Sequence, residues 1–141
     1  MWILDRIKQA FSGKDSSSED APKIPYLIHT RFNPYRLKAR AADSVELIIT
    51  VKNMTNEDKL TSITVKCSGD IGFSETTLKK SHFIRLGVMK PGEEKTVYVP
   101  VYGSSITKPK EYPLAVIVTA HFRDYDHIEN AVRKKLRLRA V

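Results

Sequence analysis

The sequence predicts a small all-β protein: a β-sandwich of seven or eight short strands, preceded by a short amphipathic α-helix. Three observations support this prediction. From Ile24 onward, apolar residues recur with a period of two, which is typical of strands buried on one face. Turn residues separate these runs, and no helical pattern lies between them. The length of 141 residues is that of one ordinary domain.

The first eleven residues, MWILDRIKQAF, have the spacing of an amphipathic helix. Five apolar side chains fall within an arc of about 120°: Ile3, Leu4, Ile7, Ala10 and Phe11. Asp5 and Gln9 point the opposite way, and Trp2 lies outside the stripe, beyond Arg6. Such a helix lies in a membrane interface, with its apolar stripe at the acyl boundary and its basic stems reaching the headgroups. The predicted membrane-binding residues are Trp2, Ile3, Leu4, Arg6, Ile7, Lys8 and Phe11.

Residues 12–24 predict a flexible linker between this helix and a domain over residues 25–141. They include the polar stretch SGKDSSSEDAPK, which cannot bury enough apolar surface to fold. A secretory signal fits residues 1–11 less well, because Asp5 and Arg6 interrupt the apolar run after four residues. Whether the helix binds lipid, a partner protein or its own domain stays open at this point.

Each expected strand is an alternating or continuously apolar run that ends at turn residues. The run LAVIVTAHF is apolar nearly throughout, as a central strand would be. In order, the runs cover residues 26–32, 35–39, 44–52, 61–67, 82–89, 96–102, 114–122 and 135–141, and the last turn covers 124–130. The residues expected to face the core are Val45, Leu47, Ile49, Val51, Ile63, Val65, Cys67, Leu114, Val116 and Val118.

Three short signals refine this picture. Pro100 lies inside a strand pattern and cannot donate to a ladder, so its strand should be an edge or carry a bulge there. Pro91 and Gly92 predict a type II turn, with a positive φ at the glycine. Tyr112, near the start of the penultimate strand, predicts a tyrosine corner in which its hydroxyl bonds nearby backbone.

Three segments resemble the immunoglobulin-like sandwich modules of the CARDB and related archaeal and bacterial families. They are ELIITVKN, RLGVMKPGEEKTVYVPV and EYPLAVIVTAHF, within a region of about residues 40–140. All three are turn and strand motifs, so the resemblance implies an immunoglobulin-like β-sandwich and no particular activity. Extracellular members of such families often carry acidic, calcium-binding or disulfide-bonded loops, whereas this chain is basic and has one cysteine.

The charge is concentrated toward the C-terminal end. Lys and Arg number 24 against 16 Asp and Glu, a net +8, and residues 1–24 sum to zero. The run KLRLRAV predicts a strand with Leu136 and Leu138 facing the core and cations about 7 Å apart on the other face, where they can follow phosphates. We expect an anionic partner to bind Lys135, Arg137 and Arg139, extended by Arg31, Arg36, Lys38 and Arg40. Recognised nucleic-acid signatures and exposed stacking-aromatic motifs are missing.

Catalysis is not predicted. The single cysteine excludes an internal disulfide framework, and Cys67 is in step with Ile63 and Val65, so we expect a buried thiol. The histidines that could serve it as a base are His29, His82, His121 and His127. The segment HFRDYDH at 121–127 holds two imidazoles and two carboxylates, which fits either a divalent-metal site or a polar turn. Because its spacing matches no strong metal motif, we predict no catalytic residue, no metal and no cofactor.

These patterns predict a non-enzymatic, cytoplasmic, peripheral membrane adaptor. Its N-terminal helix tethers a basic immunoglobulin-like domain to an anionic membrane surface, and the domain binds an unidentified protein partner through an edge strand or a loop end. Two alternatives remain. The basic sandwich binds nucleic acid, or the protein is a structural subunit whose helix docks on a partner. The sequence also leaves homo-oligomerisation open.

Overall fold

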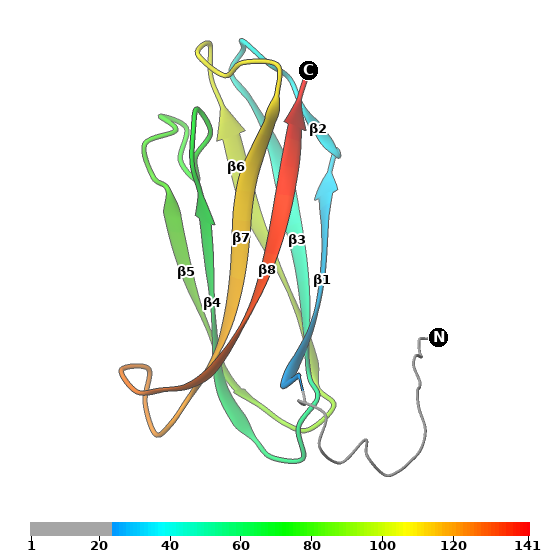
Figure 1. The fold of residues 1–141 in the computed structure, drawn as a ribbon, viewed down its shortest axis with the longest axis vertical. Helices are drawn as coiled ribbons and strands as arrows, with labels where there is room; N and C mark the ends of the chain where they lie inside the picture. The colour runs from blue at the N-terminus through cyan, green and yellow to red at the C-terminus, as the bar shows by residue number, and fades with distance from the viewer. Residues whose placement is uncertain (1–23) are drawn as a thin grey trace.

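The structure is a computed structural model that describes residues 24–141. Its ribbon consists of strands and loops in two facing sheets (Figure 1). Seven or eight strands were predicted, and the described residues form eight. These are β1 (Tyr26–Asn33), β2 (Arg36–Leu37), β3 (Asp43–Asn53), β4 (Lys59–Cys67), β5 (Ser81–Met89), β6 (Glu94–Gly103), β7 (Glu111–His121) and β8 (Ile128–Ala140).

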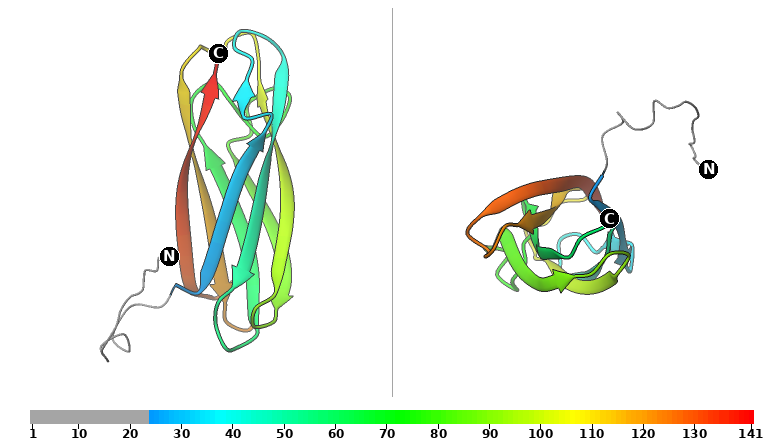
Figure 2. Two further views of the ribbon diagram at one scale, coloured as in Figure 1. Left: turned by 90° about the vertical axis from the view of Figure 1, so that its right-hand side faces the viewer. Right: turned by 90° about the horizontal axis from the view of Figure 1, so that it is seen from below.

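The strands divide into a three-stranded sheet, β1-β3-β6, and a five-stranded sheet, β2-β8-β7-β4-β5. All pairings are antiparallel except the short parallel pairing of β2 with β8. The five-stranded sheet faces the viewer in Figure 1, and the view from below in Figure 2 shows both sheets wrapped around a common interior. The fold is therefore a β-sandwich, as the periodicity predicted.

The core lies between the sheets and consists of the expected alternating positions. Val45, Leu47, Ile49 and Val51 on β3 are all buried, as are the predicted inward residues of β7. On β4, Ile63 and Val65 are buried, while Cys67 at the strand end is only half-buried against the core. The register expected for these three strands is confirmed, because a slip of one residue would have reversed every face.

Two predicted boundaries were wrong. The turn expected over residues 124–130 ends early, because β8 begins at Ile128 and Asn130 pairs with Ala120 of β7. No apolar alternation marks this part of β8, since its first residues are exposed on both faces. The strand expected over residues 35–39 is only β2, Arg36–Leu37, because the chain turns at Arg40, which has a φ of 59°.

The three local signals are confirmed. Pro100 lies on β6, which is an edge strand of its sheet. Gly92 has a φ of 77°, in the region that a type II turn requires at this position. The Tyr112 hydroxyl accepts a hydrogen bond from the backbone N–H of Lys108 at 2.7 Å, which is the expected tyrosine corner.

The predicted helix over residues 1–11 and almost all of the predicted linker lie outside the described residues. Ile24, the first described residue, is exposed and precedes β1. Within residues 24–141, no helix is long and apolar enough to cross a membrane.

Candidate functional site

The outer face of the five-stranded sheet carries the predicted anion-binding residues. Strand alternation turns the odd-numbered residues of β8 outward, so Lys135, Arg137 and Arg139 are exposed. Leu138 is buried and Leu136 packs against the core, as predicted. Arg133 is a fourth exposed cation on this face of β8.

The strand beside β8 leaves room next to these cations. Pro113 and Ala115 of β7 lie directly opposite Arg137 and Lys135, and both have short side chains. Lys66 of β4 pairs with Ala115 from the other side. The result is an open hollow of about 710 Å³. Its lining consists of Lys66, Cys67, Ser68, Pro113, Leu114, Ala115, Arg133, Lys135, Leu136 and Arg137.

This hollow is strongly cationic. Lys66, Arg133, Lys135 and Arg137 all line it, and none of the lining residues is acidic. The nearest acidic contact is made by Glu111, whose Oε1 lies 3.5 Å from Nη1 of Arg137. A pair this exposed contributes little to stability, so most of the cationic charge stays available to an anion.

The opposite face of the sandwich is balanced instead. Two cations face outward there, Arg31 on β1 and Lys52 on β3. Two carboxylates also face outward, Glu46 on β3 and Glu94 on β6. Lys52 and Glu94 pair directly across the strands. The net positive charge of the sheets is therefore carried by one face, which is an electrostatic footprint for an anionic partner.

The sequence identified part of this site. Lys135 and Arg137 line the hollow, whereas Arg139 lies beyond it, in register with Arg36 of β2 and Glu111 of β7. Arg36 thus adds a cation beside Arg139 on the same face, as expected, but Arg31 is on the other sheet. Lys66 and Arg133 were missed as site residues. Arg133 belongs to the same basic run, and Lys66 joins it only through the pairing of β4 with β7.

Aromatic side chains lie on the same face, contrary to the expectation that exposed stacking groups are missing. Phe83 of β5 is 49% exposed and is in register with Thr64 of β4. Tyr125, from the loop between β7 and β8, has its ring centroid 6.4 Å from that of Phe83. Arg85 lies over the Tyr125 ring at 4.9 Å, and the Tyr125 hydroxyl accepts the N–H of Gly87. Tyr125 therefore holds this loop against β5.

The segment at 121–127 forms a local turn in which its polar groups separate. His121 is buried and bonds Ser62, with 2.7 Å between Nε2 and Oγ. Asp124 instead accepts from the Asp126 N–H and contacts Nδ1 of His127 at 2.7 Å. These bonds to His127 and Asp126 lower the pKa of the Asp124 carboxyl, with the His127 side chain as the main cause. In the described part of the chain, no three His, Cys, Asp or Glu residues are grouped to hold a metal ion.

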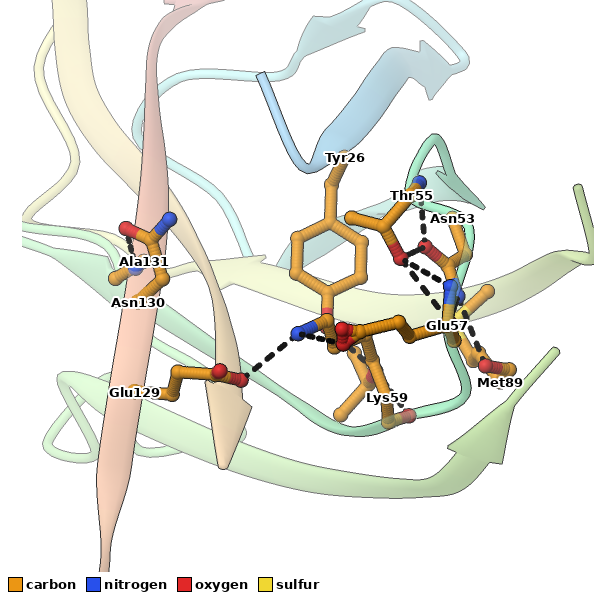
Figure 3. Close-up of polar contacts among 10 residues, drawn as sticks. Tyr26, Asn53, Thr55, Glu57, Lys59, Met89, Glu129, Asn130 and Ala131 are labelled. Atoms are coloured by element: carbon orange, nitrogen blue, oxygen red, sulfur yellow. Dashed lines mark hydrogen bonds and ion pairs between the residues drawn. The ribbon is translucent and has the colours of Figure 1, made fainter. Parts of the chain in front are cut away.

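A second polar cluster closes the end of the sandwich where the chain enters β1 (Figure 3). Lys59 lies between two carboxylates, with its Nζ 3.0 Å from Glu129 and 3.8 Å from Glu57. Nearby, the Tyr26 hydroxyl bonds Oγ1 of Thr61 at 2.7 Å, and burial raises the pKa of that tyrosine. The Tyr26–Thr61 bond holds the start of β1 to β4, and Glu57, Lys59 and Glu129 also line a second hollow of about 370 Å³.

The candidate nucleophile and one candidate base are engaged elsewhere. Cys67 is half-buried and donates weakly to the carbonyl of Ile71 at 3.6 Å, and burial raises the pKa of its thiol. His82 has the Lys79 ammonium 3.0 Å from its Nδ1. Burial and this neighbouring cation lower the pKa of His82.

Comparisons with known proteins bear on the fold. No protein-family model matches the chain, and no curated protein matches it in sequence. Among solved structures, a FixG-related protein from Vibrio parahaemolyticus has a TM-score of 0.53 at 13% identity, over 84% of this chain and 98% of that one. A fragment of native Escherichia coli alpha-2-macroglobulin from domain MG7 to the C-terminus also gives 0.53, at 14% identity, over 82% of this chain and 17% of that one.

A third structure gives the same TM-score of 0.53, the complex of zinc 2-glycoprotein and prolactin inducible protein from human seminal plasma, at 14% identity over 82% of this chain and 94% of that one. Likeness at this level of identity shows the fold alone. It supports the immunoglobulin-like β-sandwich that the sequence predicts.

Proposed function

We propose that this protein is a non-enzymatic peripheral membrane adaptor. In this proposal, residues 1–11 hold the protein on an anionic membrane surface, and the sandwich presents the outer face of its five-stranded sheet to an anionic partner. The observation that carries the proposal is the segregation of charge. Four cations line one hollow with no acidic residue among them, while the opposite face is balanced.

The membrane part rests on the sequence of the N-terminal segment. Ile3, Leu4, Ile7 and Phe11 form its apolar stripe, and Trp2 suits headgroup depth. Arg6 and Lys8 contribute about 1 kcal/mol each near an anionic surface. The total is modest, so binding is reversible and sensitive to salt. We place the protein in the cytoplasm, where a lone thiol such as Cys67 stays reduced.

The absence of catalysis is also part of the proposal. A nucleophile needs a positioned base, and the half-buried Cys67 donates instead to a backbone carbonyl. His121 and Ser62 bond each other beneath the surface, where a substrate does not reach them. The finer resemblance to CARDB-type modules, carried by ELIITVKN and the Pro91–Gly92 turn, is also part of the proposal and concerns the fold alone.

Co-sedimentation of the full chain with vesicles of 30% phosphatidylglycerol tests the tether. Ile7→Asp places a carboxylate in the centre of the apolar stripe and should leave most of the protein in the supernatant at 100 mM salt. Gln9→Asp adds the same charge on the polar face and is the matched control, which should sediment nearly as the wild type does. Equal sedimentation of Ile7→Asp and wild type, or failure of the wild type to bind at low salt, contradicts the proposal.

A further inference from the structure

We propose that the anionic partner of the cationic face is a single-stranded nucleic acid, which lies along β8 in the hollow and stacks a base on Phe83. This inference rests on the proposed function for the existence of an anionic partner, and it names that partner's chemical class. To the two predicted residues that line the hollow, it adds Lys66 and Arg133, which also line it, and Phe83, which stands outside it on β5.

The spacing of the cations suits a phosphodiester backbone. Alternate residues of a strand lie about 7 Å apart, so Arg133, Lys135 and Arg137 form a straight row about 13 Å long. Successive phosphates of an extended single strand are separated by a similar distance. Arg139 continues the row beyond the hollow, and Arg36 lies beside Arg139 on β2. A strand bound here would therefore meet one cation for each phosphate.

The shape of the face favours a strand over a lipid surface. Lys66 and the β8 cations stand on either side of Pro113 and Ala115, and Ala115 is only 7% exposed between its longer neighbours. The distance from β4 to β8 is two strand spacings, about 10 Å. A flat bilayer does not enter such a hollow, whereas a single extended chain fits along it.

The aromatic groups supply a second, independent contact. Phe83 is 49% exposed and belongs to the same row across the sheet as Thr64, Ile117 and Arg133. Proteins that bind single strands combine a cationic groove with aromatic rings on which bases stack. Arg85, held against the Tyr125 ring at 4.9 Å, adds a cation beside Phe83. The stacking surface and the phosphate row thus lie on one face.

Fluorescence anisotropy with a labelled ten-nucleotide oligothymidylate tests this inference on the full chain. Arg133→Gln with Lys135→Gln should weaken binding about tenfold or more in 50 mM salt. The slope of the logarithm of the binding constant against the logarithm of the salt concentration should become shallower by about 1.4. Each phosphate contact on a single strand contributes about 0.7 to this slope, and the variant removes two cations. The matched control, Arg31→Gln with Lys52→Gln, removes the same charge from the opposite face and should stay within twofold of wild type.

A second pair of variants separates stacking from charge. Phe83→Ala should weaken oligothymidylate binding about fivefold or more. Tyr98→Ala removes a 58% exposed aromatic side chain from the other sheet and should change binding by less than twofold. A duplex of the same length should bind the wild type more weakly than the single strand, because its bases are not free to stack.

An equal loss of oligonucleotide affinity in the two double variants, on the cationic face and on the opposite face, would mean that only net charge matters. That result would overturn the inference. The inference would also be overturned if the wild type bound the duplex more tightly than the single strand and Phe83→Ala did not change the affinity for the single strand. If the oligonucleotide does not bind, while Arg133→Gln with Lys135→Gln lowers vesicle sedimentation, the face binds lipid and the inference is wrong although the membrane tether stands. Ile7→Asp should leave oligonucleotide binding unchanged, so failure of the tether is distinguishable from failure of this site.

Discussion

The hydroxyl of Ser62 and Nε2 of His121 lie 2.7 Å apart, and both side chains are buried although they stand on the outer face of the five-stranded sheet. Tyr125 makes this burial possible, with its ring centroid 5.0 Å from that of His121. The other ring nitrogen of His121, Nδ1, is buried and has no hydrogen-bond partner among the described residues. The loop after β7 therefore covers a polar pair at one end of the cationic face.

This pair predicts a strongly non-additive response to mutation. Ser62→Ala and His121→Leu should each destabilise the protein by about 1–3 kcal/mol, because each leaves a buried polar group without its partner. The double variant should cost clearly less than the sum, since no unpaired group remains. Urea unfolding of the four proteins measures the coupling. Additive losses within about 0.5 kcal/mol would mean that the bond contributes nothing specific.

The packing of the core predicts a large loss of stability when either of two residues on facing sheets is truncated. Leu47 on β3 and Val116 on β7 are fully buried. Truncating either to alanine should lower the free energy of unfolding by about 2–4 kcal/mol, through lost transfer energy and the cavity left behind. Glu46→Ala, at the exposed neighbour of Leu47, is the control and should cost less than about 0.5 kcal/mol in urea unfolding. Losses that small at both core positions would contradict the register described.

His82 predicts a pH dependence of stability. Burial and the Lys79 ammonium lower its pKa below the ordinary 6.5, so the unfolded chain takes up this proton more readily than the folded one. The stability that the folded protein gains by holding His82 neutral is fully present above pH 6.5. It is lost as the pH falls from 6.5 toward the lower pKa of His82 in the folded protein. The fall in melting temperature between pH 8 and pH 5.5 should be smaller in His82→Gln than in wild type. An identical fall in both proteins would assign the effect to other groups.

Most of the fold could be predicted because its strands are locally encoded. In β3 every second residue from Val45 to Val51 is apolar and buried, and turn residues such as Pro91 and Gly92 mark where strands reverse. The start of β8 escaped prediction, because Glu129 and Asn130 are exposed and form no alternating pattern. Their strand conformation comes from pairing with β7, which a local pattern does not reveal.

The candidate site was predictable only in the part that lies on one strand. Lys135 and Arg137 could be assigned to one face of β8 by alternation alone. Lys66 is far from them in sequence and reaches the hollow through the order of strands in the sheet. Phe83 and Tyr125 meet in the same way, because a loop folds back over β5. Contacts between strands that are distant in sequence depend on topology, so they had to come from the structure.

The central claim is that this protein joins a membrane to a single-stranded nucleic acid through two separate surfaces, and a three-component sedimentation assay tests it most directly. Vesicles of 30% phosphatidylglycerol, a labelled ten-nucleotide oligothymidylate and the full chain are mixed, and both protein and label are measured in the pellet. Wild type should carry the oligonucleotide into the pellet. Ile7→Asp should leave both the protein and the oligonucleotide in the supernatant. The variant with Arg133→Gln and Lys135→Gln should pellet with the vesicles but without the oligonucleotide. The account is contradicted if wild type pellets without the oligonucleotide, or if the double variant leaves the vesicles as completely as Ile7→Asp does.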